Sequence, residues 1–183
     1  MNKKESEILI ARIEKWYAKL PNYFIYNKLP FEAKFGWSKE KVSFKDRLNL
    51  EYKPIKEGDE WGNKWESAWF HLKANMPSEW RGKQIASELD FSGEGLVYDN
   101  RGNEIQGITN ASIWDQNFVR TRVILGKNFI SNGKIEMWVE AAANSLFGVF
   151  TDPDVKEESP KKHGWFDAKV EKMKVGIFDE ELW

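Results

Sequence analysis

The chain contains few residues that could perform nucleophilic or metal chemistry. It has two histidines, His71 and His163, and no cysteine. A catalytic triad requires a base beside a serine or cysteine nucleophile, whereas His71 lies within a predicted strand and His163 within a predicted polar loop. The two histidines also lack the close spacing that is typical of zinc ligands. The sequence therefore predicts neither a catalytic histidine nor a metal site in this chain.

Carboxylates are plentiful, but they form no recognisable catalytic pair. Glycoside hydrolysis requires two carboxylates about 5 to 10 Å apart across a sugar-binding cleft. Asp90, Glu94 and Asp99 lie around one predicted hairpin, where acidic side chains usually face solvent. We assign no catalytic residue, so the hypothesis that the chain is itself a hydrolase lacks an identifiable pair.

The densest aromatic segment lies at the entrance to a predicted strand and contains four large rings: Trp61, Trp65, Trp69 and Phe70. These rings could close the end of a β-sandwich core, or they could form an exposed platform that stacks on sugars. Under the second interpretation, Trp61 and Trp65 bind carbohydrate together with the hairpin acids Glu94 and Asp99. Solvent exposure of Trp61 or Trp65 would distinguish the two interpretations.

Charge and composition exclude several classes of partner. The 28 basic and 29 acidic residues are mixed along the chain and leave a net charge of -1, so we expect no binding to nucleic acid or to anionic membranes. The first 20 residues are too charged for a signal peptide, and no run approaches the roughly 20 apolar residues of a membrane span. We expect a cytoplasmic protein.

Apolar residues at helical spacing predict one helix over residues 6–20, with Ser6 as its N-cap and Pro21 after its end. Its apolar stripe consists of Leu9, Ile13, Trp16 and Leu20. This stripe must pack against a partner, either its own domain, which is the simpler expectation, or a neighbouring domain in an assembly. Residues 21–46, with Pro21, Pro30 and Gly36, are expected to form an irregular wrapping segment.

After residue 46 the pattern changes to short alternating segments, which predict antiparallel strands. The expected strands cover residues 47–52, 66–76, 83–91, 93–99, 120–125, 134–142 and 168–178. Residues 99–102 predict a hairpin turn, and residues 151–164 predict a polar loop. The predicted fold is mainly β, an antiparallel β-sandwich with an N-terminal helix. We expect residues 1–46 to form the helix and wrapping segment and 47–183 the sandwich, in one compact domain.

Three distinctive segments follow one another in the chain, EWGNKWESAWFHL, MPSEWRGKQIASELDFSGEGLVYDNRGNEIQG and IEMWVEAAANSLFG, with a fourth and weaker one, KMKVGIFDEELW. In this order they resemble the N-terminal region of the family 38 α-mannosidases of the cytosolic and bacterial type. The similarity extends from about Glu60 to Gly148. Residues 108–118 and 151–164 follow no pattern of the family.

The resemblance implies a jelly-roll, galactose-binding-domain-like sandwich that precedes a catalytic α/β barrel. In this family the enzyme is a retaining, zinc-dependent mannosidase whose nucleophile and zinc ligands belong to the barrel, and no segment of this chain matches those residues. The end of the chain within a predicted helical turn suggests either a domain of a longer enzyme or a truncated paralogue.

Two functions follow as expectations. In the first, the chain is a non-catalytic accessory domain of an α-mannosidase that packs against the catalytic barrel and contributes to the substrate cleft or to oligomer assembly. Its N-terminal helix would then also be a candidate contact between copies. In the second, the chain is a free-standing module that binds mannose-containing glycans through surface aromatic residues. Exposed apolar surface would favour the first function, and an aromatic platform flanked by polar groups would favour the second.

Overall fold

The computed structural model describes residues 3–63, 66–109, 119–143 and 169–183. One helix, α1 (Lys3–Tyr17), leads the chain, and short 3-10 helices cover Leu20–Tyr23, Arg47–Asn49 and Ser78–Trp80. The strands are β1 (Ile25–Pro30), β2 (Glu32–Ser38), β3 (Tyr52–Ile55), β4 (Ser67–Asn75), β5 (Ile85–Asp90), β6 (Glu94–Tyr98), β7 (Glu104–Thr109), β8 (Arg122–Leu125), β9 (Ile130–Ser131), β10 (Lys134–Ala142) and β11 (Lys172–Phe178). The mainly-β fold with an N-terminal helix is confirmed.

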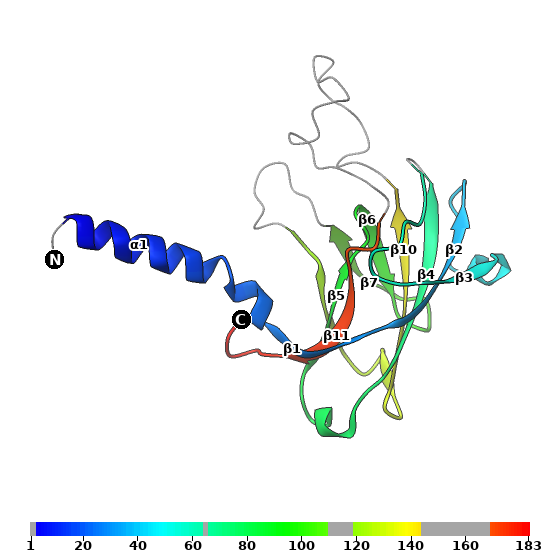
Figure 1. Ribbon diagram of the computed structural model, residues 1–183. Helices are drawn as coiled ribbons and strands as arrows, with labels where there is room; N and C mark the ends of the chain where they lie inside the picture. Colours follow the sequence, from blue (N-terminus) through cyan, green and yellow to red (C-terminus); the bar gives the residue numbers. More distant parts are fainter. Residues whose placement is uncertain (1–2, 64–65, 110–118, 144–168) are drawn as a thin grey trace, which may run out of the picture.

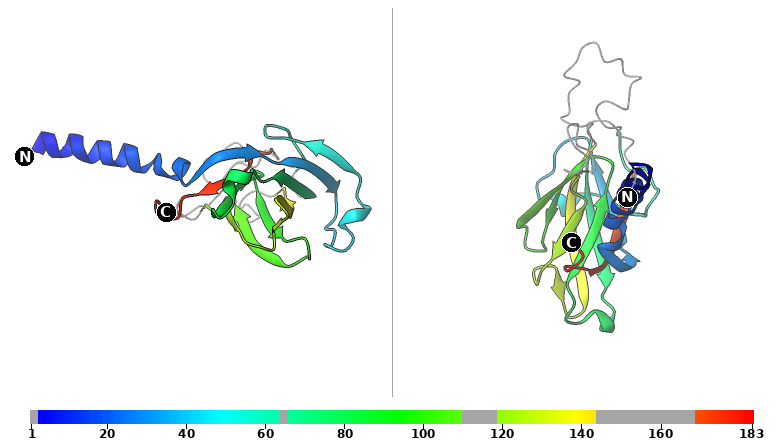
Figure 2. Two further views of the ribbon diagram at one scale, coloured as in Figure 1. Left: turned by 90° about the horizontal axis from the view of Figure 1, so that it is seen from below. Right: turned by 90° about the vertical axis from the view of Figure 1, so that its left-hand side faces the viewer.

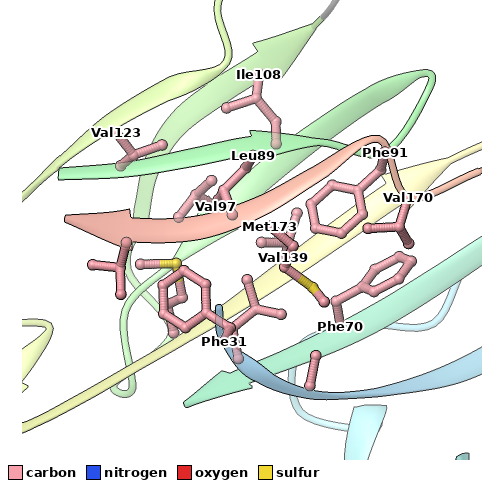
Figure 3. Packing of buried hydrophobic residues seen from close by; sticks show 14 of the residues in the cluster. Phe31, Phe70, Leu89, Phe91, Val97, Ile108, Val123, Val139, Val170 and Met173 are labelled. Atoms are coloured by element: carbon pink, nitrogen blue, oxygen red, sulfur yellow. The ribbon is translucent and has the colours of Figure 1, made fainter. Parts of the chain in front are cut away.

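Two antiparallel sheets pack face to face (Figure 1). The four-stranded sheet has the order β1-β11-β5-β8, and the seven-stranded sheet has the order β3-β2-β4-β10-β6-β7, with β9 paired to β10. Side chains from both sheets fill the space between them, and Figure 3 shows Phe70 and Val139 of the larger sheet facing Leu89 and Met173 of the smaller one. The arrangement is a β-sandwich.

The centre of the larger sheet is the β4–β10 pair, which is in register from Ser67↔Ala142 to Asn75↔Lys134. Alternation along β4 sends Phe70 and Leu72 into the core between the sheets, where both side chains are fully buried. Trp69 points to the opposite face of the sheet and packs there with Trp138 of β10. The strands predicted at 66–76 and 134–142 are confirmed as β4 and β10.

The expectation of an irregular segment at residues 21–46 is wrong for residues 25–38. One extended segment runs through both sheets here, because β1 pairs with β11 in the smaller sheet and β2 pairs with β4 in the larger one. Phe31 lies at the crossing, where its side chain is buried and its N–H donates to the Met173 carbonyl at 3.2 Å. Pro30 is compatible with the sheet because β1 is an edge strand.

Other strand boundaries also differ. Residues 47–49 form a 3-10 helix, so the strand predicted at 47–52 begins only at Tyr52. The last strand begins at Lys172, and the polar loop predicted at 151–164 lies outside the described residues. The hairpin turn predicted at residues 99–102 is confirmed, since it joins β6 to β7.

The helix α1 begins before Ser6, so Ser6 is not its N-cap. It ends at Tyr17, and Leu20 belongs to the 3-10 helix that follows. Figure 1 and the left-hand view of Figure 2 show α1 projecting away from the sandwich. Its apolar side chains are exposed, with Ile13 at 62% and Trp16 at 60% of their full accessibility. The expectation that this stripe packs on its own domain is therefore wrong for Leu9, Ile13 and Trp16, whereas Leu20 packs against a buried cluster of the sandwich.

Close packing of β1 against β11 depends on Gly176. The register of the pair shifts between Tyr26 and Leu29, and Asn27 adopts a positive φ of 50° at this irregularity. A Cβ atom on Gly176 would lie 2.6 Å from the Tyr26 carbonyl oxygen and 2.7 Å from Cγ2 of Ile25. The irregular strand β1 can therefore approach β11 only where a side chain is missing.

We expect Gly176→Ala to lower the free energy of unfolding by about 1–3 kcal/mol, because the added methyl group meets backbone atoms that cannot move aside. Gly107→Ala in β7 is the matched control. Its Cβ would meet nothing nearer than the Gly95 carbonyl at 4.0 Å, so the change should stay within about 0.5 kcal/mol. Denaturant unfolding followed by circular dichroism measures both values, and equal losses would contradict the assigned role of Gly176.

Candidate functional site

Trp61 is a core residue. Its side chain is only 3% exposed, its indole N–H donates to the Phe91 carbonyl at 3.0 Å, and its ring meets Phe70 edge to face at 5.4 Å between centroids. A ring buried in this way has no free face for a sugar. For Trp61 the structure therefore supports the interpretation that it closes the core, while Trp65 lies outside the described residues.

Asp99 builds the hairpin turn. It is 1% exposed, and its carboxylate accepts hydrogen bonds from the backbone N–H groups of Arg101 and Asn103 at 2.9 and 3.0 Å and from the Asn103 side chain at 2.8 Å. Burial raises the pKa of Asp99, but these donors outweigh it and the pKa is lowered. Glu94 begins β6 and is exposed, whereas Asp99 follows the end of that strand. Of the four residues predicted to bind sugar, Trp61 and Asp99 are buried and Glu94 is exposed, while Trp65 lies outside the described residues.

A charged and aromatic cluster lies on the outer face of the larger sheet. The Arg47 guanidinium lies 3.5 Å from the ring centroid of Phe44 and 4.2 Å from that of Trp138, and it donates to the Phe44 carbonyl. Such cation–π contacts hold the charge between aromatic faces. Arg47 is buried, which lowers its pKa, and its Nε has no hydrogen-bond partner among the described residues.

His71 and Glu136 extend this cluster toward solvent. The imidazole stacks on Trp138 at 3.8 Å, and its Nε2 lies 2.6 Å from Oε1 of Glu136, which Lys73 also approaches at 3.4 Å. Burial lowers the pKa of His71 more than Glu136 raises it, so the imidazole is neutral at pH 7 and donates a hydrogen bond to the carboxylate. The cluster anchors residues 42–52 on the sheet.

A second group of polar and aromatic side chains lies at the end of β2. Trp37 is 40% exposed, and its indole N–H donates to Oε2 of Glu66 at 2.5 Å. The same oxygen accepts the backbone N–H of Asn63 at 2.8 Å and its side-chain amide at 3.0 Å. Partial burial raises the pKa of Glu66, but these hydrogen bonds outweigh it and lower the pKa. We call Trp37, Asn63 and Glu66 the rim cluster.

The rim cluster was not predicted, although the sequence carries a sign of it. Ala33, Phe35 and Trp37 alternate along β2 as a strand requires, and the first two pack against the core. This alternation indicates a strand within residues 21–46, where an irregular segment was expected.

Neither a metal site nor a membrane span is found in the part of the chain that the structure describes. No group of three or more His, Asp or Glu residues there could hold a metal ion, and none of its helices is long and apolar enough to cross a membrane.

For Trp61 we expect substitution by alanine to cost about 3–5 kcal/mol of unfolding free energy, as for other large core residues. Trp16→Ala in α1 removes the same atoms from an exposed position and should change the value by less than about 0.5 kcal/mol. Urea unfolding of both variants separates the two cases. A Trp61→Ala variant as stable as the control would mean that the ring is not part of the core.

His71 should make stability depend on pH. Its pKa in the folded protein lies below the ordinary value of 6.5, so the unfolded chain binds this proton more readily and folding is weakened as pH falls through 6.5. The advantage in stability of the wild type over His71→Gln should therefore shrink between about pH 7.5 and 5.5. Thermal unfolding of both proteins across this range measures the difference in their stability. His163 is present in both, so its contribution cancels. Parallel curves would contradict the assignment.

Comparisons with known proteins agree with the fold. Residues 29–171 match the jelly roll domain of alpha-mannosidase. Alpha-mannosidase G of Dictyostelium discoideum is 31% identical over 160 residues, which cover 81% of this chain and 14% of that protein. Alpha-mannosidase 2C1 of Homo sapiens is 25% identical over 123 residues, which cover 67% of this chain and 11% of that protein.

Among solved structures, Ruminococcus gnavus beta-glucuronidase matches with a TM-score of 0.53 and 16% identity, over 84% of this chain and 28% of that one. At this identity the similarity shows the fold alone. The resemblance to α-mannosidases drawn from the sequence motifs is confirmed, because the family match covers most of the chain. The chain spans only a small part of the curated relatives, and it belongs to the family of α-mannosidase jelly roll domains.

Proposed function

We propose that this chain is a non-catalytic accessory domain of an α-mannosidase of glycoside hydrolase family 38, and that it packs against the catalytic barrel through α1. The observation that carries the proposal is the exposed apolar stripe of α1. The same surface could also join copies of the enzyme.

The stripe has the form of a helix face that is normally covered. Successive helical residues are separated by 100°, so the residues Leu9, Ile10, Ile13, Trp16 and Tyr17 share one side of α1. Each of them is exposed in the described chain. Single exposed apolar residues are common, but a continuous row of large ones marks a surface that another surface covers.

Helix energetics support the same conclusion. Isolated helices shorter than about 12–15 residues are marginal in water, and most helices in proteins are stabilised by packing of their apolar face. α1 has 15 residues and projects away from the sandwich (Figure 2). A second surface is therefore needed to keep it helical.

A non-catalytic role is consistent with how the chain uses its carboxylates. Glu88 is paired with Lys28 at 2.8 Å and Lys172 at 3.0 Å, Glu136 is paired with His71, and the Asp99 carboxylate accepts bonds from its own turn. These half-buried or buried acids are engaged in holding strands and turns. In this proposal the zinc ion and the nucleophile belong to the barrel of a cytoplasmic enzyme, beyond this chain.

The test compares amide hydrogen exchange of residues 3–17 in the isolated chain and in the complete enzyme. We expect fast exchange in the isolated chain and slow exchange in the complete enzyme, because only there is the stripe covered. Ile13→Glu with Trp16→Glu should restore fast exchange in the complete enzyme.

Ile8→Glu is the matched control, since Ile8 is exposed on the other side of α1 and the charge should leave the protection unchanged. Protection lost equally in both variants, or α-mannosidase activity of the isolated chain on an aryl mannoside, would overturn the proposal. If instead the isolated chain protects α1 and sediments as a dimer, the stripe joins copies and not domains.

A further inference from the structure

We propose that the rim cluster of Trp37, Asn63 and Glu66 is a carbohydrate contact site that binds one pyranose ring. Trp37 would stack on the apolar face of the sugar, and Glu66 would accept hydrogen bonds from its hydroxyl groups. The site is distinct from the residues predicted from the sequence, and the proposal stands whether or not α1 packs on a catalytic barrel.

The position of Trp37 is the first argument. Along β2, Ala33 is buried and Phe35 is half-buried against the core, whereas Trp37 is 40% exposed. These three side chains lie on the same face of β2, and Trp37, at the end of the strand, is the one that is exposed to solvent. An indole that is part buried and part exposed has one supported side and surface left for a ligand.

The ring is also fixed in orientation. Its N–H is bound to Glu66, which is held in turn by the backbone and side chain of Asn63. A side chain that is ordered before binding loses little further conformational entropy, which favours the weak contacts typical of single sugar rings.

Glu66 retains capacity to accept further hydrogen bonds. All three donors lie on Oε2, and among the described residues Oε1 accepts no hydrogen bond. The lowered pKa keeps the group ionised, so both oxygens act only as acceptors. Sugar hydroxyl groups are donors, and hydrogen bonds from a donor to a carboxylate are stronger than those between neutral groups.

The surroundings favour a sugar over a protein partner. Trp37 is followed by the exposed polar residues Lys39 and Glu40, and Asn63 is exposed beside it. One amphipathic ring flanked by polar groups offers a stacking face beside hydrogen-bonding partners, whereas the continuous apolar stripe of α1 is typical of a protein contact.

The experiment titrates the isotope-labelled chain with methyl α-D-mannopyranoside and methyl β-D-glucopyranoside, and with sorbitol as an open-chain polyol that has no ring face. We expect a saturable shift of the Trp37 indole N–H signal with at least one pyranoside and none with sorbitol. Trp37→Ala should weaken binding by at least about tenfold, a change of about 1.4 kcal/mol. Glu66→Gln, which keeps the shape of the side chain, should weaken it severalfold.

Trp16→Ala is the control for loss of an exposed tryptophan, and Glu40→Gln is the control for loss of a nearby carboxylate; both should bind as the wild type does. Unfolding midpoints of all variants are measured in parallel, and if Trp37→Ala unfolds, Glu66→Gln and the wild-type indole signal decide the result. An indole signal unmoved by either pyranoside, an equal shift with sorbitol, or unchanged binding by Glu66→Gln would overturn the proposal. None of these outcomes bears on α1, so this proposal and that of the accessory domain fail separately.

Discussion

The structure depends on the pairing of β4 with β10, because both faces of this central pair are buried. Alternation along each strand gives one row of side chains to the core between the sheets and another to the outer face. The inner row meets the smaller sheet, so the outer row, with Trp69 and Trp138, requires a separate cover. Residues 42–52 provide it, and the Trp69 indole N–H binds the Val42 carbonyl at 2.8 Å. The long segment between β2 and β4 is thus part of the packed structure.

Residues 42–52 are held on the outer face of the larger sheet by a buried charged residue, Arg47. Arg47 lies between the rings of Phe44 and Trp138, where its cation replaces lost hydration with contacts to aromatic faces. The Tyr52 hydroxyl group donates a hydrogen bond to the Arg47 carbonyl at 3.0 Å, and burial raises the pKa of Tyr52 to about 12. The pair therefore stays in one charge state across physiological pH. At the edge of the same cluster, the pKa of His71 is lowered from its ordinary value of 6.5, whereas Glu136, whose pKa is lowered from 4.5, stays ionised.

Sequence reasoning succeeded where local pattern decides the structure. β4 and β10 are long and alternate regularly, and the turn at Asp99 uses residues that favour it, so both were predicted correctly. It failed for β1, where a break in register at Asn27 interrupts the alternation, and for β2, whose regular alternation is short and begins only after the change of sheet at Phe31. It also could not tell which tryptophans are buried and which are exposed. Trp61 and Trp37 have the same side chain, and only their positions relative to the second sheet make one a core residue and the other half exposed.

The pairing of β1 with β11 has a consequence for biosynthesis. Its partners lie at opposite ends of the sequence, with Ile25 opposite Phe178. During translation β1 leaves the ribosome early, yet its partner β11 is made after every other strand that the structure describes. Until then the smaller sheet lacks its edge pair, and the exposed strand is open to wrong pairing. Completion of the smaller sheet therefore waits for residues 172–178, so β1 stays unpaired for longer than a strand whose partner is close in the sequence.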